Sequence, residues 1–125
     1  VFGLEECMRS KFSSLSLGQR NRVNLLRYLL QDFQVLIMDE SLANVDEKTR
    51  ETILLKVKEL YPTVVFLYIS HNVVEVAKFC RQIIVIRDAE KTPQGAEIGG
   101  MDHRAGRQFD QDRLEHVMLE IMNAA

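Results

Sequence analysis

The sequence predicts an α/β fold in which helices flank a parallel sheet. Three short apolar runs, at 35–38, 64–69 and 83–87, have the length and composition of buried strands. Helical patterns separate them, and a strand–helix–strand order favours right-handed parallel crossovers. With 125 residues, 46% of them hydrophobic and 27% charged, the chain fits one ordinary globular domain.

The first half of the chain is expected to hold two helices around the first strand. Residues 4–12 are predicted to form a short helix, and Ser16 is suited to cap the next one. The apolar stripe predicted for that second helix consists of Val23, Leu26 and Leu30, widened by Leu25 and Leu29.

The middle of the chain reads as strand, helix, strand. The run Val35–Met38 is predicted to be a buried parallel strand. Asp46 can cap a helix that extends to Leu60, and Pro62 then prevents its continuation. The apolar face predicted for this helix consists of Ile53, Leu54, Val57 and Leu60. Val64–Ile69 is predicted to be a second buried strand, parallel to the first.

The last third is predicted to contain a short helix at 73–80, a third strand at Ile83–Arg87 and a loop at 88–109. The loop assignment rests on four Gly residues, a Pro and mixed charges. Asp110 then opens a final helix. The stripe predicted for that helix consists of Leu114, Val117, Met118, Ile121 and Met122.

Composition excludes several classes of protein. Sixteen basic and eighteen acidic residues give a net charge of −2, so no nucleic-acid partner is expected. The apolar runs are too short to cross a bilayer, and no signal peptide is expected at the start. Cys7 and Cys80 are interpreted as reduced thiols. Since an initiator Met is also missing, we expect the chain to begin within a longer protein.

A possible phosphate-binding turn lies at Leu15-Ser16-Leu17-Gly18-Gln19, where a helix is predicted to begin. Unpaired N–H groups and the positive end of the helix dipole attract anions there. The Ser16 hydroxyl adds a donor, and Gly18 permits close backbone approach. The alternative is a Ser-capped amphipathic helix with no ligand.

Asp39 and Glu40 follow the first predicted strand. One carboxylate can hold Mg²⁺ together with phosphate oxygens, and a second can orient or deprotonate a water. The alternative is a strand that ends in solvated acids. His71, after the second predicted strand, can gain charge near neutral pH, although a single His is more often a packing or surface residue.

Four segments together resemble the ATP-binding cassette (ABC) ATPases. Leu15–Gln19 resembles the signature turn, Val35–Glu40 the Walker B strand, and Ala43-Asn44-Val45-Asp46 the D-loop, while Ile69-Ser70-His71 is similar to the switch histidine segment. Leu17 stands where the family usually has Gly, and Ser41-Leu42 where Pro-Thr is usual. No G-x-x-x-x-G-K-[ST] phosphate loop occurs in the chain.

The resemblance implies roles for the site residues. Glu40 and His71 would be catalytic, Asp39 would hold the metal, and the implied cofactors are ATP and Mg²⁺. The nucleotide-contacting residues implied by the resemblance are Ser16, Gly18, Gln19 and Asp46.

The resemblance also implies an architecture: a partial P-loop NTPase sheet that lacks the phosphate-loop strand. The whole of 1–125 would be the C-terminal portion of one nucleotide-binding domain, with a signature helix in 1–31, a core in 32–87 and a loop and helix in 88–125. In the family the phosphate-loop strand lies between 64–69 and 83–87. We therefore expect those two strands either to pair directly or to exchange with a second copy.

The implied function is ATP hydrolysis coupled to transport across a membrane. The implied partners are a second nucleotide-binding subunit arranged head to tail, transmembrane permease subunits and the missing N-terminal half of the domain. The protein would then lie in the cytoplasm, on the inner face of the membrane. Two alternatives remain at this stage: a non-transport ABC ATPase of DNA repair or translation, and a non-catalytic assembly fragment.

Overall fold

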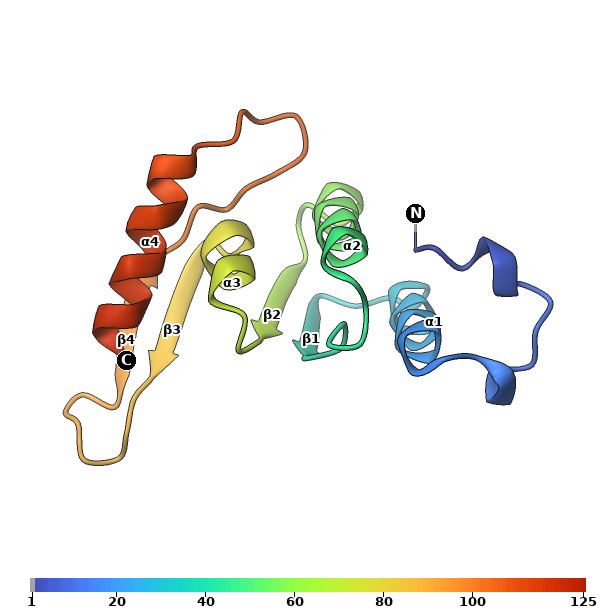
Figure 1. The fold of residues 1–125 in the computed structure, drawn as a ribbon, viewed down its shortest axis with the longest axis horizontal. Coiled ribbons are helices and arrows are strands. Elements are labelled where there is room, and N and C mark those ends of the chain that lie inside the picture. The colour runs from blue at the N-terminus through green and yellow to red at the C-terminus, as the bar shows by residue number, and fades with distance from the viewer. Residues whose placement is uncertain (1) are drawn as a thin grey trace. The chain divides into compact units, whose positions relative to one another are not determined.

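The computed structural model describes residues 2–125, which form two compact units (Figure 1). The first unit runs to Ile69 and the second from Ser70 to Ala125. The first contains α1 (Leu17–Leu29), β1 (Val35–Asp39), α2 (Glu47–Leu60) and β2 (Val65–Ile69). The second contains α3 (Val73–Phe79), β3 (Gln82–Ile86), β4 (Gly95–Gly99) and α4 (Gln111–Ala124).

The segment before α1 contains two short 3₁₀ helices, η1 (Glu5–Cys7) and η2 (Phe12–Ser14). The prediction of a helix at 4–12 is therefore wrong. Leu4 is the one buried residue of that stretch, so a longer helix would have no apolar face to pack.

Strands β1 and β2 pair in parallel, with Val35 opposite Val65 and Asp39 opposite Ile69. This confirms the predicted parallel crossover. The prediction that both strands are buried is wrong, because only one face of the pair is covered. Leu36 and Met38 are 8% and 1% exposed, whereas the alternate residues Val35 and Ile37 lie open.

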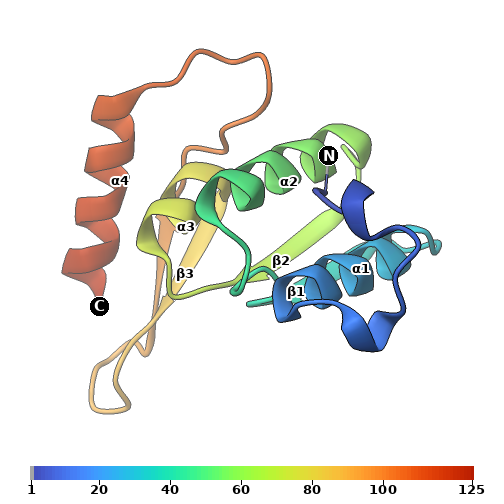
Figure 2. The same cartoon turned by 45° about the vertical axis from the view of Figure 1, so that its right-hand side comes forward.

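Helices α1 and α2 also contribute to this first core (Figure 2). The residues they bury are Leu25, Leu29, Ile53, Leu54 and Val57. At the far ends of the two helices, the Tyr61 hydroxyl donates to the Leu29 carbonyl at 2.8 Å, and the Tyr61 ring packs on Phe33. Leu30 and Leu60, both placed on the apolar stripes by the sequence, are largely exposed because each sits at or beyond the last turn of its helix.

The chain leaves β1 through a tight turn at Glu40. Glu40 has a φ of 49°, in the left-handed region that non-glycine residues rarely occupy. Its N–H donates to the Ile69 carbonyl at 3.0 Å, which extends the β1–β2 ladder, and its carbonyl accepts from the Ala43 N–H at 3.0 Å. Backbone hydrogen bonds on both sides therefore hold Glu40 in this conformation.

In the second unit, β3 pairs antiparallel with β4, with Gln82 opposite Gly99 and Ile86 opposite Gly95. Two predictions are wrong here. The strand at 83–87 does not join a parallel sheet, and residues 88–109 are not all loop. The Gly-rich composition concealed β4, which has only Ala96, Glu97 and Ile98 between its terminal glycines.

The segment after β4 closes the end of α3. The Met101 N–H donates to the Ala77 carbonyl at 3.0 Å, and the Asp102 N–H donates to the Cys80 carbonyl at 3.1 Å. The His103 N–H donates to the Lys78 carbonyl at 2.8 Å. These carbonyls belong to the end of α3, where a helix leaves its acceptors unpaired.

Helix α4 lies along the β3–β4 hairpin and beside α3, and Asp110 caps it as predicted (Figure 1). The buried cluster consists of Ala77, Ile83, Ile98, Leu114, Val117 and Ile121. Met118 packs against this cluster, while Met122 is 60% exposed and extends past it. The predicted stripe is thus correct except at its last residue.

The described residues thus form two separate two-stranded sheets, β1–β2 and β3–β4. Direct pairing of 64–69 with 83–87, one of the two expected arrangements, is therefore wrong. A local antiparallel partner, β4, is available to β3 through a short connection, and such a hairpin has a low closure cost.

We expect Ile53→Ala to lower the free energy of unfolding by about 2–5 kcal/mol, because Ile53 is fully buried on α2. Leu60→Ala, on the same helix but 55% exposed, should cost less than about 0.5 kcal/mol. Urea denaturation followed by circular dichroism measures both. Equal costs would contradict the packing described for α2.

The left-handed backbone of Glu40 should reverse the usual order of stability of glycine and alanine variants. Glycine normally lowers stability relative to alanine by roughly 0.5–1 kcal/mol, but a left-handed backbone costs a residue with a Cβ about 1–2 kcal/mol. Glu40→Gly should therefore be about 1 kcal/mol more stable than Glu40→Ala. Both variants lack the carboxylate, so its interactions cancel in the comparison.

The control for this comparison is the same pair of substitutions at Glu59, an exposed helical position of α2. There glycine should be about 1 kcal/mol less stable than alanine. If both positions gave the ordinary order in denaturant titrations, Glu40 would not have the left-handed backbone.

Candidate functional site

The predicted phosphate-binding turn forms the first turn of α1. Ser16 is the N-cap: its Oγ accepts from the Gln19 N–H at 3.2 Å, and Gln19 Oε1 accepts from the Ser16 N–H at 2.9 Å. This reciprocal capping box confirms the helix start expected from the sequence.

The capping box leaves a defined set of groups for a ligand. Of the N–H groups that begin a helix, those of Leu17 and Gly18 find no acceptor within the helix or its cap. The Ser16 hydroxyl accepts one bond, so its own proton remains a potential donor. Two N–H groups and one hydroxyl at the positive end of a helix form a suitable cradle for an anion.

Gly18 joins this turn to a second one, residues 43–46. A Cβ built on Gly18 would lie 2.4 Å from the Asn44 carbonyl oxygen and 3.9 Å from Val45 Cγ2. No side chain fits at that distance, so glycine is needed for α1 to approach the 43–46 backbone. The structure thus brings together two of the four segments that the sequence singled out.

The acidic pair, Asp39 and Glu40, lies at the end of β1, shortly before the 43–46 turn. Asp39 is the last residue of the strand and Glu40 occupies the left-handed turn; both are exposed. Within residues 2–125 no group of three or more His, Cys, Asp or Glu is arranged to bind a metal. A magnesium ion here would need phosphate and water oxygens in addition to carboxylate, as Mg²⁺ sites in nucleotide enzymes commonly do.

Asp46 caps α2, as predicted from its position. Its carboxylate accepts from the Thr49 N–H at 3.0 Å. Hydrogen bonds from the Thr49 side chain and backbone lower the pKa of Asp46, and the positive charge of Arg22 contributes in the same direction. The carboxylate therefore stays ionised at neutral pH, where it complements the positive end of α2.

His71 is exposed and lies in the bend between β2 and α3, at the start of the second unit. Next to it, Asn72 caps α3 by accepting from the Glu75 N–H, and the Asn72 N–H donates to Ser70 Oγ. The short turn after β2 thus has a defined conformation.

Two arginines in the first unit were not assigned a role from the sequence. Arg22 donates from Nε to the Gly18 carbonyl at 3.2 Å and from Nη1 to the Phe2 carbonyl at 2.9 Å. Arg50 donates from Nη1 to the Val45 carbonyl. Arg22 follows Gly18 by four residues, one helical turn, but nothing in that spacing shows which carbonyls it binds.

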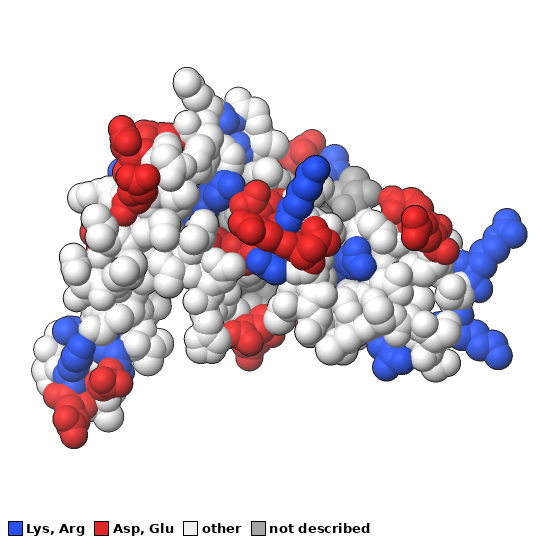
Figure 3. Space-filling model, viewed as in Figure 1, with Lys and Arg blue, Asp and Glu red and all other residues white. Residues whose placement is uncertain are grey.

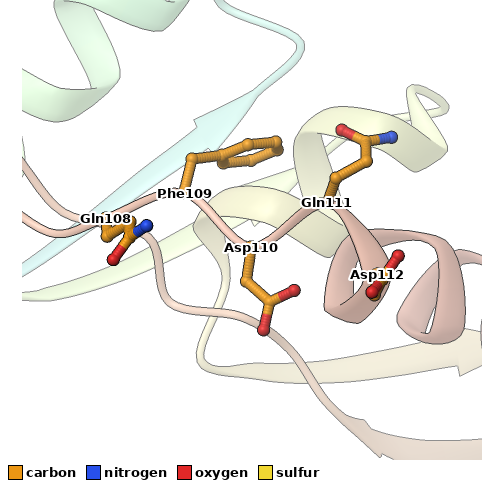
Figure 4. A pocket seen from close by; sticks show the side chains of 5 residues that line it. All are labelled: Gln108, Phe109, Asp110, Gln111 and Asp112. Atoms are coloured by element: carbon orange, nitrogen blue, oxygen red, sulfur yellow. The ribbon is translucent and has the colours of Figure 1, made fainter.

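One pocket of the second unit can be compared with the candidate site residues. A pocket in the second unit is lined by residues 108–112, where the side chains of Phe109 and Asp110 point to opposite sides of the chain (Figure 4). Asp110 there already caps α4 by accepting from the Arg113 N–H at 3.1 Å. The pocket includes none of the residues expected to take part in catalysis, metal binding or nucleotide binding.

Charge is distributed in small groups. On the visible face acidic and basic side chains lie next to one another in several small groups, with neutral surface between the groups (Figure 3). Among the described residues, none of the helices combines the length and the apolarity required to cross a bilayer.

Comparison with known proteins finds similarity to ABC transporter ATP-binding proteins. The model of the ABC transporter family matches residues 2–43, which include the 15–19 turn, β1 and the acidic pair. Over an alignment of 138 positions the chain is 28% identical to the oligosaccharides import ATP-binding protein MsmX of Bacillus subtilis strain 168, covering 100% of this chain and 38% of that protein.

Two further relatives align over a shorter range. The molybdenum import ATP-binding protein ModC of Rhizobium johnstonii is 32% identical over 100 residues, 78% of this chain and 28% of that protein. The uncharacterized ABC transporter ATP-binding protein YcjV of Escherichia coli O157:H7 is 31% identical over 98 residues, 77% of this chain and 27% of that protein.

The chain thus spans between about a quarter and two-fifths of the length of these relatives. The matched region contains the capped turn on α1 and the acidic end of β1, in the order that the sequence resemblance requires. Over the matched residues the chain is similar to the ATP-binding proteins of ABC transporters, and these matches support an ABC ATPase fragment.

Proposed function

We propose that this chain is the hydrolysis half of the ATP-binding subunit of an ABC transporter. The observation that supports this most directly is the contact of Gly18 with Asn44, which packs the anion-cradling turn of α1 against the turn that follows Glu40. The relatives MsmX and ModC are named as ATP-binding proteins of import systems, which favours transport over other uses of the fold.

In this proposal the 15–19 turn binds the terminal phosphate of ATP through the Leu17 and Gly18 N–H groups and the Ser16 hydroxyl. Gln19 holds Ser16 in place through the capping box. In the same proposal, the phosphate is presented by a second nucleotide-binding subunit. Asp46 fixes the start of α2 next to this turn.

Glu40 accepts a proton from the attacking water, and Asp39 would hold Mg²⁺ through a carboxylate oxygen. His71 donates to the phosphate during hydrolysis. The metal supplies charge neutralisation on the phosphate oxygens when bound. The intact protein would associate with permease subunits on the cytoplasmic face of the membrane and with the N-terminal half of its own domain.

The 125-residue chain alone should not bind Mg-ATP with useful affinity, because a cradle of two N–H groups and a hydroxyl offers few of the contacts that a nucleotide needs. Isothermal titration calorimetry of the chain with Mg-ATP measures this. A dissociation constant in the micromolar range would contradict the proposed division of the site between two subunits.

In an intact ATPase that contains this segment, Glu40→Gln should reduce turnover by about 10²–10⁴-fold and leave nucleotide binding in place. The amide keeps the volume of the side chain and loses the base. Glu59→Gln, at an exposed position of α2, is the matched control and should hydrolyse ATP normally. Unchanged turnover in Glu40→Gln would remove Glu40 from its catalytic role.

His71→Ala in the same protein should also slow hydrolysis, because it removes a phosphate donor. His116→Ala is its control, since His116 lies on α4 beside Glu120, with Nε2 2.8 Å from Oε1. Steady-state phosphate release distinguishes the two. Equal rates of phosphate release in both histidine variants would show that His71 takes no part in hydrolysis.

A further inference from the structure

The two turns of the candidate site are connected by backbone contacts rather than by side chains that could adapt. Gly18 is buried, and its α-carbon lies against the Asn44 carbonyl, with room for no Cβ. Asn44 itself is exposed, so the contact is made by the main chain of the turn.

Groups on both sides hold this contact in place. On the α1 side, the Arg22 guanidinium bonds to the Gly18 carbonyl and to the carbonyls of Phe2 and Gly3. The Gly18 peptide is thereby held to the segment that precedes the helix. A lysine could not replace this arrangement, because an ammonium lacks the planar set of donors.

On the other side, the 43–46 turn is anchored in the core. Leu42 and Val45 are 1% and 5% exposed, and the Val45 N–H donates to the Leu42 carbonyl at 3.1 Å. Arg50 binds the Val45 carbonyl from α2. The same turn begins at Glu40, whose carbonyl accepts from the Ala43 N–H.

We propose that Gly18 and Arg22 are positioning residues that couple the 15–19 turn to the 43–46 turn, so that displacement of the first by a phosphate is transmitted to the Glu40 backbone. This proposal rests on the proposed function for its phosphate ligand. The coupling itself is a property of the chain and can be measured without nucleotide.

The direction in which a Cβ on Gly18 would point distinguishes a positioning role from direct contact with the phosphate. The methyl group of an alanine at position 18 would point at Asn44, inside the protein. Gly18→Ala should therefore separate the two turns, whereas the N–H groups of the first turn would remain available to a phosphate.

The first experiment is amide hydrogen exchange on the 125-residue chain. Gly18→Ala should accelerate exchange of the Ala43 and Val45 N–H groups by at least about tenfold, with the β3–β4 amides unchanged. Gly99→Ala is the matched control, because a Cβ on Gly99 meets nothing within 4 Å. In Gly99→Ala the Ala43 and Val45 N–H groups should exchange at the wild-type rates.

Arg22→Gln provides an independent variant, because it removes the guanidinium without adding atoms at the contact. It should accelerate the same two amides, and Arg22→Lys should fail to restore them. If Gly18→Ala did not fold, this series would decide the question alone. Unchanged exchange at Ala43 and Val45 in the folded variants would overturn the proposal.

The second experiment uses the intact ATPase. Gly18→Ala should lower kcat by about tenfold or more while KM for ATP changes by less than about threefold, since the loss falls on the transition state and not on nucleotide binding. A rise in KM with unchanged kcat would overturn the positioning role. If the wild-type ATPase did not hydrolyse ATP, the proposed function would fail, while the exchange data would still decide the coupling.

Discussion

The parallel pairing of β1 with β2 is the constraint on which the organisation of the first unit depends. Its register places Leu36 and Met38 on one face, and both side chains are buried. One further bond, from the Glu40 N–H to the Ile69 carbonyl, continues the ladder beyond the strand. That bond holds the residue at which the chain turns, so the position of the 40–46 segment follows from the strand pairing.

The 40–46 segment in turn fixes the position of α1. Leu42 and Val45 anchor the turn in the core, and the Asn44 carbonyl then presents a backbone surface that only glycine can approach. The helix that carries the anion cradle is thus positioned by the same turn that follows the acidic pair. A left-handed non-glycine residue at Glu40 is unfavourable for folding, and such strain is characteristic of functional positions.

The second unit has a different basis. Its core is a local antiparallel hairpin covered by α4 and by α3, whose end is closed by the segment after β4. Backbone approach matters here too, since a Cβ on Gly100 would lie within 2 Å of the Cys80 carbonyl oxygen, at 1.9 Å. Gly100 therefore marks a close approach of two backbone segments, in a region whose composition suggested a loop.

The sequence by itself determined helices α1 to α4, the caps at Ser16, Asp46 and Asp110, and the parallel pairing of the first two strands. The helices and their caps depend on side-chain periodicity and on hydrogen bonds within four residues, which are local and can be read from a single chain. The parallel pairing is not local, and it was predicted from the strand–helix–strand order.

Tertiary structure alone decided the rest: the antiparallel partner of β3, the one-sided burial of β1, the left-handed backbone at Glu40, and the contact between Gly18 and Asn44. The features of the first unit depend on which groups meet across long stretches of sequence, whereas the β3–β4 hairpin is local and was concealed by the Gly-rich composition of β4. The four motifs identified the candidate residues, but the Arg22 bonds to Gly18 and Phe2 required three-dimensional geometry, because carbonyl groups are the same in every residue and leave no signal in the sequence.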